Sequence, residues 1–178
     1  MCMPKAIVKG LFRDTKIVTE DSDDAREFYT QGVYGSLVKN KVELSLMEAL
    51  YLVEKERLEV YDGRNKVIDA DKLLKKAKKN QTNFFVKYSV FKDMRNRGYI
   101  VKTALKFGAV FRVYDRGVKP GEDHARWILY PVHESEGNTW QEFAAKNRVA
   151  HSTKKRLLIG VVDEEGEVSY WEVRWLRP

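Results

Sequence analysis

The hydrophobic pattern of the chain changes its period at Gly98, and this change constrains the fold more than any other feature. Before it, Phe84, Tyr88 and Phe91 follow the spacing of one helical face, and Gly98 ends that helix. After it come short apolar runs separated by polar turns, the pattern of β-strands. The predicted strands are residues 99–105, 109–114, 126–132, 156–162 and 168–175. The second half is therefore predicted to be strand-rich.

Capping signals locate the remaining helices. Ser45 with Glu48 and Thr139 with Glu142 each have the spacing of a capping box, and Ser22 is a third N-cap. The predicted helices are residues 23–31, about 46–57, a Lys-rich helix from residue 71, 84–97, and 140 to about 146. Residues 6–18 and 58–61 are predicted strands. The chain is therefore predicted to be α+β, with a boundary near residues 80–85 and domains 1–83 and 84–178.

Composition excludes several classes of protein. The 178 residues suffice for one large domain or two small ones, and 43% hydrophobic content excludes a disordered chain. The longest apolar run, residues 157–162, is far too short to span a membrane, and the N-terminus lacks a signal-peptide core. Cys2 is the single cysteine, which excludes an internal disulfide and a Cys-rich zinc site. We therefore expect a cytoplasmic protein without a membrane partner.

The charge is unevenly distributed. The net charge is +7 and the pI about 9.3, a moderate indication of a polyanionic partner. Residues 1–83 carry 16 basic and 14 acidic side chains, and residues 84–178 carry 17 and 12. Four acids lie close together in the basic half: Asp163, Glu164, Glu165 and Glu167. Such a cluster is usually a solvated turn, but its isolation on a basic half also favours a docking role.

Few residues offer catalytic chemistry. The sequence has three histidines and no metalloprotease, phosphate-loop, nucleophile-elbow or dinucleotide motif. The histidines lack metal-ligand spacing, so we expect no metal and no cofactor. Asp115, Glu122 and Asp123 are only a weak signal for a metal-dependent nuclease. His124 ends a loop with two glycines and a proline between two predicted strands, where functional side chains often lie. A surface histidine on a linker is an equal alternative.

Lys154, Lys155 and Arg156 precede a fully apolar strand. They are either a solvated cluster or a source of one fixed positive charge beside a phosphate. A tyrosine, a histidine and a lysine suit metal-free RNA cleavage, in which the 2′-hydroxyl is the nucleophile. The enzyme then needs a base for that hydroxyl, an acid for the 5′-oxygen and a cation for the phosphorane. Because the ordinary pKa of tyrosine is about 10, it is a poor base unless nearby cations lower that pKa.

Three segments carry a resemblance to a known family. The longest reads YSVFKDMRNRGYIVKTALKFGAVFRVY over residues 88–114, and the others read RVAHSTKKRLLIGVVD over 148–163 and ELSLMEALYL over 43–52. Together they resemble the archaeal tRNA-intron (tRNA-splicing) endonucleases. The resemblance covers nearly the whole chain beyond residue 30, and the first segment is long and specific. Ala104 and Val110 depart from the family's usual Gly and Asp.

The resemblance implies an N-terminal mixed α/β domain and a C-terminal nuclease domain with a central mixed sheet flanked by helices. It implies a catalytic triad in which Tyr114 is the general base, His124 the general acid and Lys155 the phosphorane stabiliser. Cleavage would need no metal and leave a 2′,3′-cyclic phosphate and a 5′-hydroxyl. Arg148 matches a family arginine that stacks on a bulge nucleotide.

The implied substrate is precursor tRNA with a bulge–helix–bulge motif at its intron–exon junctions. Two related cuts need two active sites at a fixed separation, so the resemblance implies an oligomer. Residues 163–167 match an acidic loop that inserts into a basic pocket of another subunit. A short chain with a complete triad resembles the homotetrameric type. The alternative assemblies are a catalytic subunit that needs a separate structural subunit, and a different packing of subunits. The alternative function is a non-catalytic RNA-binding or structural subunit.

Overall fold

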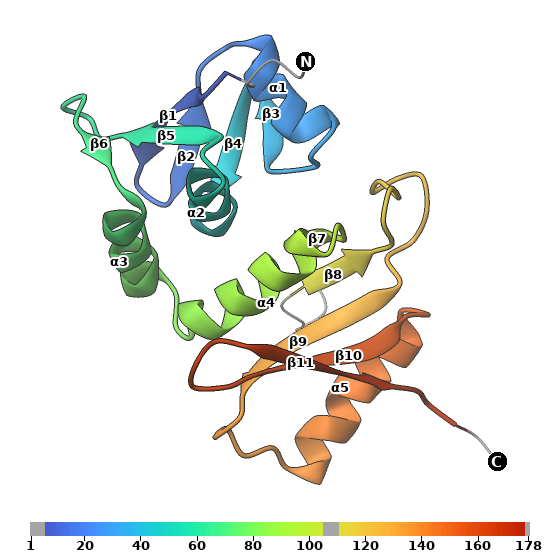
Figure 1. Cartoon of the computed structure of the whole chain (residues 1–178). Coiled ribbons are helices and arrows are strands. Elements are labelled where there is room, and N and C mark those ends of the chain that lie inside the picture. The colour runs from blue at the N-terminus through green and yellow to red at the C-terminus, as the bar shows by residue number, and fades with distance from the viewer. Residues whose placement is uncertain (1–5, 105–110, 177–178) are drawn as a thin grey trace. The chain divides into compact units, whose positions relative to one another are not determined.

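The computed structural model of the protein describes residues 6–104 and 111–176; Cys2 and residues 105, 109 and 110 of the predicted strands lie outside them. The chain divides into two compact units, Met1–Phe84 and Phe85–Pro178. Within the described residues, five helices and two mixed β-sheets make the fold α+β, which confirms the predicted class (Figure 1). None of these helices combines the length and the apolar character that crossing a bilayer requires.

The N-terminal unit is a six-stranded sheet with three helices. The strands lie in the order β3-β4-β2-β1-β5-β6, with β1 and β5 parallel and the other pairs antiparallel. Its elements are β1 (Val8–Arg13), β2 (Lys16–Thr19), α1 (Asp23–Thr30), β3 (Ser36–Val38), β4 (Lys41–Ser45), α2 (Leu46–Glu54), β5 (Leu58–Tyr61), β6 (Val67–Ile68) and α3 (Ala70–Asn80).

Burial alternates along these strands, as it does when one face of a sheet packs against a core. On β2, Ile17 is fully buried, whereas its neighbour Val18 is partly exposed. The helices add Phe28, Leu50 and Leu73 to the buried side. The opposite face, which we call the outer face, carries the half-exposed and exposed residues of each strand.

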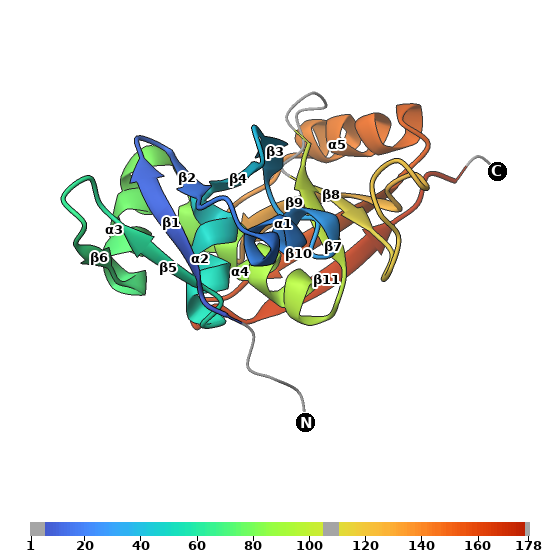
Figure 2. The ribbon, with the colours of Figure 1, turned by 90° about the horizontal axis from the view of Figure 1, so that it is seen from above.

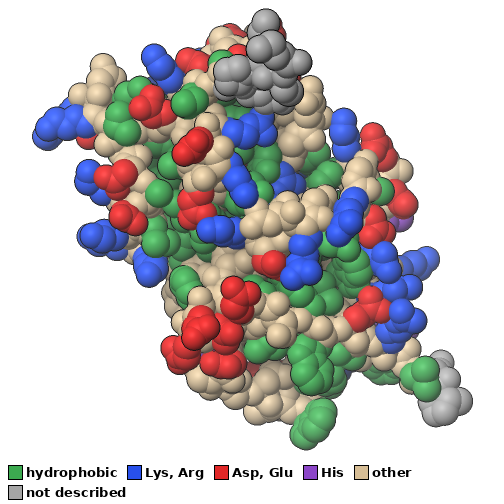
Figure 3. Space-filling view, viewed as in Figure 1, with side chains coloured by type: hydrophobic (Ala, Val, Ile, Leu, Met, Phe, Trp, Pro, Cys, Tyr) green, Lys and Arg blue, Asp and Glu red, His purple; other side chains and the backbone are tan. Residues whose placement is uncertain are grey.

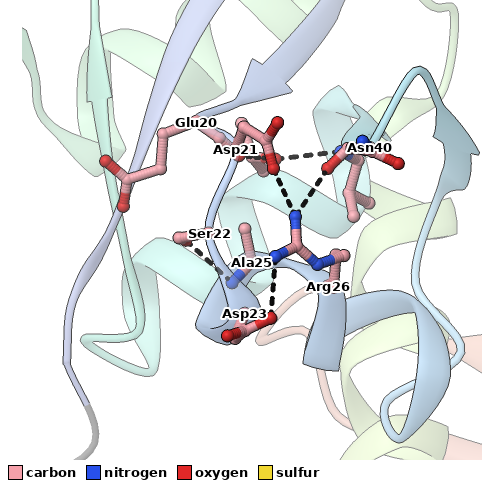
Figure 4. A network of polar contacts seen from close by, with 9 residues as sticks. Glu20, Asp21, Ser22, Asp23, Ala25, Arg26 and Asn40 are labelled. Atoms are coloured by element: carbon pink, nitrogen blue, oxygen red, sulfur yellow. Dashed lines mark hydrogen bonds and ion pairs between the residues drawn. The ribbon is translucent and has the colours of Figure 1, made fainter.

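Polar contacts at the start of α1 fix its entry from β2. Ser22 is the N-cap and accepts a hydrogen bond from the Ala25 backbone N–H at 3.2 Å. Arg26 pairs with Asp21 and Asp23, and its Nη1 also donates to the Asn40 carbonyl in the β3–β4 turn (Figure 4). These ion pairs raise the pKa of Arg26. One side chain therefore ties the helix start to a hairpin distant in sequence.

The C-terminal unit is a five-stranded sheet with a helix on each face. The strands lie in the order β11-β10-β9-β8-β7, and β9 and β10 are the parallel pair, joined through α5 in a β–α–β crossover. Its elements are β7 (Ile100–Thr103), β8 (Phe111–Tyr114), β9 (Trp127–His133), α5 (Trp140–Ser152), β10 (Arg156–Val162) and β11 (Val168–Val173); α4 (Phe84–Asn96) begins at the unit boundary.

Helices α4 and α5 lie on opposite sides of this sheet (Figures 1 and 2). On the α4 side, a Cβ added at Gly160 would lie 3.1 Å from Val90, so glycine permits the close approach of helix and strand. On the α5 side, Ala150 packs in a buried cluster with Ile128 and Leu157. Because both faces are covered, consecutive residues of β9 are fully buried, unlike those of β2.

The five predicted helices are present, but strands β3, β4 and β6 were not predicted, and two helix bounds were wrong. Both capping boxes are present, and β10 has its predicted bounds. The helix predicted to end near Lys146 continues to Ser152, because no glycine or proline interrupts it before Thr153. The Lys-rich helix begins at Ala70, since Asp69 rather than Asp71 accepts the capping hydrogen bond.

Candidate active site

The strand register of the C-terminal sheet brings three distant segments to one end of the sheet. Val113 of β8 pairs with Trp127 of β9, which pairs with Arg156 of β10. One residue further out, the Arg126 N–H donates to the Val113 carbonyl at 2.9 Å, and the Arg156 N–H donates to the Arg126 carbonyl at 3.0 Å. These bonds set the strand ends side by side at what we call the β8–β10 end.

Tyr114, Arg126 and Lys155 occupy one row across this end, each one residue beyond a paired position. Neighbouring strands lie about 4.8 Å apart, so the backbones of Tyr114 and Lys155 are roughly 10 Å apart. Side chains in one row point to one face, and Ile128 and Leu157, two residues further along, pack against α5. The row therefore faces the α5 side, with Tyr114 buried and Lys155 partly exposed.

The end of α5 fixes the position of Lys155. The Lys154 N–H donates to the His151 carbonyl at 3.0 Å, and the Lys155 N–H donates to the Ala150 carbonyl at 2.9 Å. With Thr153 as C-cap and Lys154 at φ 55°, these two bonds form a Schellman motif. Lys155 Nζ then donates to the Thr153 carbonyl at 2.9 Å. The two adjacent lysines therefore differ: Lys154 adopts the left-handed conformation of the turn, and Lys155 lies in the row with Tyr114 and Arg126.

His124 lies in the loop between β8 and β9, two residues before Arg126. Gly117 and Gly121 have positive φ in this loop, and Asp115 and Lys119 carbonyls accept the backbone bonds of two successive turns. The imidazole is exposed. Among the described residues, no hydrogen bond joins the Tyr114, His124 and Lys155 side chains. The fold therefore brings their segments to one end of the sheet and leaves the histidine on a solvent-facing loop.

Two further residues at this end were not among the sequence predictions. Arg126 lies between Tyr114 and Lys155, pairs with Asp115 at 3.0 Å and stacks 4.4 Å from the Trp127 ring. Only the strand register reveals its place, because a lone arginine at a strand start carries no signal.

The second is Glu172, which lies on the other face. Its carboxylate accepts a 2.7 Å hydrogen bond from Trp127 Nε1 and pairs with Arg156 and Arg174. The Trp127 bond and these cations lower the pKa of Glu172 to about 2, against burial, which raises it. The residue therefore links the starts of β9 and β10 to β11.

The other predicted residues lie around this end or far from it. Arg148 is exposed on α5, and its Nε donates to the Ala144 carbonyl of the same helix at 3.4 Å. His151 stacks on Trp175 with ring centroids 5.3 Å apart. His133 ends β9, at the opposite end of the sheet, where its Nδ1 is 2.8 Å from Ser135 Oγ. No group of three potential metal-ligating side chains occurs within residues 6–104 and 111–176.

The four predicted acids lie in the β10–β11 turn, where acidic side chains gather on the surface (Figure 3). Asp163 Oδ1 accepts from the Glu165 and Glu167 backbone N–H groups at 3.0 and 2.9 Å, so this carboxylate holds the turn together. Glu134 adds a further carboxylate by accepting from the Glu164 N–H at 3.3 Å. Since β10 is seven residues long, this turn lies roughly 20 Å from the β8–β10 end.

Comparisons with known proteins match both units. The family model of the tRNA intron endonuclease catalytic C-terminal domain matches residues 84–170, and that of its N-terminal domain matches residues 8–74. The chain is 45% identical to a tRNA-splicing endonuclease of Nanoarchaeum equitans over 80% of this chain and 94% of the relative. It is 36% identical to those of Thermococcus kodakarensis (91% and 94%) and Pyrococcus furiosus (97% and 99%).

Proposed function

The chain belongs to the tRNA intron endonuclease family, and on that premise we propose that it cuts precursor tRNA at bulge–helix–bulge splice sites in the cytoplasm. The reaction is a metal-independent transesterification. The 2′-hydroxyl attacks the adjacent phosphorus and the 5′-oxygen leaves, giving a 2′,3′-cyclic phosphate and a 5′-hydroxyl.

We assign one role to each member of the triad. Tyr114 accepts the proton of the 2′-hydroxyl, and His124 donates a proton to the leaving 5′-oxygen. Lys155 stabilises the negative charge of the phosphorane. The observation that carries this proposal is the strand register, which aligns Tyr114 and Lys155 and attaches the His124 loop to the same strand ends.

Charge at the β8–β10 end supports these roles. Arg126 lies between Tyr114 and Lys155 in the row and brings a second basic residue to this end, where its guanidinium pairs with Asp115 at 3.0 Å. The exposure of His124 gives its imidazole access to solvent, from which it regains a proton after each turnover. Arg148 is exposed seven residues before Lys155, and we assign it the stacking contact with an unpaired bulge base.

One experiment tests the reaction. The purified chain alone is incubated with an intron-containing precursor tRNA in EDTA, and the RNA ends are identified by phosphatase and kinase treatment. We expect cuts at both junctions with cyclic-phosphate and 5′-hydroxyl ends. Binding without cutting would favour the alternative of a non-catalytic subunit. Cutting that stops in EDTA, or that leaves a 5′-phosphate, would contradict the metal-free mechanism.

We also propose that the acidic turn docks into another copy in a homotetramer, which holds two active sites at a fixed separation. Because Asp163 holds the turn together, Glu164, Glu165 and Glu167 are the carboxylates available to a partner. Reversing these three to lysine should therefore convert tetramers to dimers in light scattering, while Asp163 keeps the turn folded. The matched control replaces three lysines of α3, Lys75, Lys78 and Lys79, with glutamate. A tetramer that survives the first change would contradict docking by this turn.

A further inference from the structure

The outer face of the N-terminal sheet holds a pocket of about 480 Å³, formed by β1, β2, the start of β4 and the end of β5. Leu11 and Val18 pair across β1 and β2 and contribute its apolar floor. Tyr61 is beside them, because it pairs with Leu11 across β1 and β5. Its hydroxyl donates to Glu59 Oε2 at 2.5 Å, which fixes the phenol ring. The pocket therefore has a floor suited to a flat or apolar group.

Three cations line this pocket against one carboxylate: Lys9, Arg13 and Lys41 face Glu20. Glu20 Oε1 already accepts the Lys9 backbone N–H at 3.2 Å. Neighbouring Lys16, by contrast, is neutralised by Glu43 at 2.8 Å. Within residues 6–104 and 111–176, none of the three lining cations forms a side-chain ion pair. Glu59, which pairs with Lys9 across β1 and β5 and accepts from the Tyr61 hydroxyl, adds a second carboxylate beside the pocket. Three cations against two carboxylates leave the pocket with an excess of positive charge.

The spacing of these cations suits an extended anion that carries several charges. The Glu20 N–H donates to the Lys9 carbonyl at 2.9 Å, and the β2–β4 register places Lys41 on the other side of Glu20. Lys9 and Lys41 are therefore two strands apart, roughly 10 Å. Arg13 lies four residues from Lys9 along β1, roughly 13 Å. With their backbones spread over this distance, the three cations can each meet a different phosphate of a nucleic-acid backbone.

We propose that this pocket is a second RNA-binding site, which holds the phosphodiester backbone of the precursor RNA outside its splice sites. The proposal takes the identity of the polyanion from the proposed function. All pocket residues belong to the N-terminal unit, whereas the triad belongs to the C-terminal unit, so the pocket shares no residue with the triad. Lys9, Arg13 and Lys41 contact phosphates, and the Tyr61 floor packs against a base or ribose.

The test measures binding of full-length precursor tRNA by fluorescence anisotropy at several salt concentrations, with 2′-deoxy nucleotides at the cut sites. We expect the K9A/R13A/K41A variant to bind at least roughly tenfold more weakly. Its slope of log affinity against log salt should fall by about two units, at roughly 0.7–0.9 per lost phosphate contact. A short bulge–helix–bulge duplex without the tRNA body should lose less affinity.

Two further variants make the test specific. K75A/K78A/K79A removes the same charge from α3 of the same unit and should change affinity much less. Glu20→Gln removes the carboxylate that lines the pocket but keeps an acceptor for the Lys9 N–H, so it should tighten binding severalfold. If the two triple variants lose RNA affinity equally, the protein attracts RNA through its overall positive charge, and the pocket is not a specific binding site. A pocket variant that binds RNA normally but changes its mass in solution would identify the occupant as another protein copy.

Because the RNA cannot be cut, this assay does not depend on catalysis. If wild-type protein binds ordinary precursor tRNA but never cuts it, the proposed endonuclease activity is wrong, and the proposed RNA-binding pocket is not affected. If wild-type protein cuts the precursor and the K9A/R13A/K41A variant binds RNA as tightly as wild type, only the proposed RNA-binding pocket is wrong.

Discussion

The two sheets of this protein differ in how many of their faces are covered. The N-terminal sheet packs its helices on one face and leaves a polar, basic outer face. The C-terminal sheet is covered by α4 on one face and α5 on the other, so its central strands are buried on both sides. The central strands of such a sheet offer polar side chains chiefly at their ends, and the Tyr114 and Lys155 positions lie there.

The largest effects on stability should follow from this difference in coverage. Ile128→Ala and Leu129→Ala truncate consecutive residues of β9, and each should lower the free energy of unfolding by about 2–5 kcal/mol. On β2, Ile17→Ala should cost a similar amount, whereas Val18→Ala should cost less than about 1 kcal/mol, because only Ile17 is fully buried. Urea unfolding followed by circular dichroism measures all four variants.

Tryptophan fluorescence assigns each loss to a unit, since all four tryptophans lie in residues 85–178. The β9 variants should shift the fluorescence transition. The β2 variants should change the circular dichroism transition with less effect on fluorescence. Equal costs for Ile17 and Val18 would show that the outer face is covered after all.

A smaller effect should be present near neutral pH and shrink in acid. The pKa of Glu172 is lowered to about 2 from its ordinary value near 4.5, so its bonds to Trp127 and the arginines stabilise the fold above about pH 4.5. That contribution is lost as the pH falls toward 2. Glu172→Gln should therefore lower stability by about 1–2 kcal/mol at pH 6, and the difference from wild type should shrink by pH 2.5. Thermal melts followed by fluorescence measure both; a pH-independent difference would contradict the assigned linkage.

The smallest effect has the opposite sign. Lys154 is held at φ 55°, a conformation that favours glycine by roughly 1 kcal/mol. Lys154→Gly should therefore stabilise the C-terminal unit by about 0.5–1 kcal/mol. Glu56→Gly, at φ 55° in the N-terminal unit, is the matched control and should stabilise its own unit instead. A destabilised Lys154→Gly in a fluorescence melt would contradict the Schellman turn.

The sequence predicted where most helices and strands lie better than it predicted which strands lie side by side in the sheets. The capping boxes and β10 depend on local spacing and were confirmed. The predicted end of α5 was wrong, because no local residue marks the true end and the Schellman turn uses a lysine where glycine is usual. Tyr114, His124 and Lys155 could be named from the resemblance.

The place of Arg126 between Tyr114 and Lys155 could not be predicted, since it follows from register between strands far apart in sequence. The outer-face pocket was missed for the same reason: Lys9, Arg13 and Lys41 are scattered in sequence and meet only when β1, β2 and β4 pair.

We propose that the β8–β10 end cuts RNA with Lys155, not Lys154, as its fixed charge. Single-turnover cleavage of precursor tRNA in EDTA, at saturating protein, tests it with Lys155→Ala and Lys154→Gly side by side. We predict that Lys155→Ala cuts about 10²–10⁴ times more slowly, as expected for loss of transition-state stabilisation, while Lys154→Gly cuts within a fewfold of wild type. Cutting by Lys155→Ala at the wild-type rate, together with loss of cutting by Lys154→Gly, would contradict the assignment of Lys155.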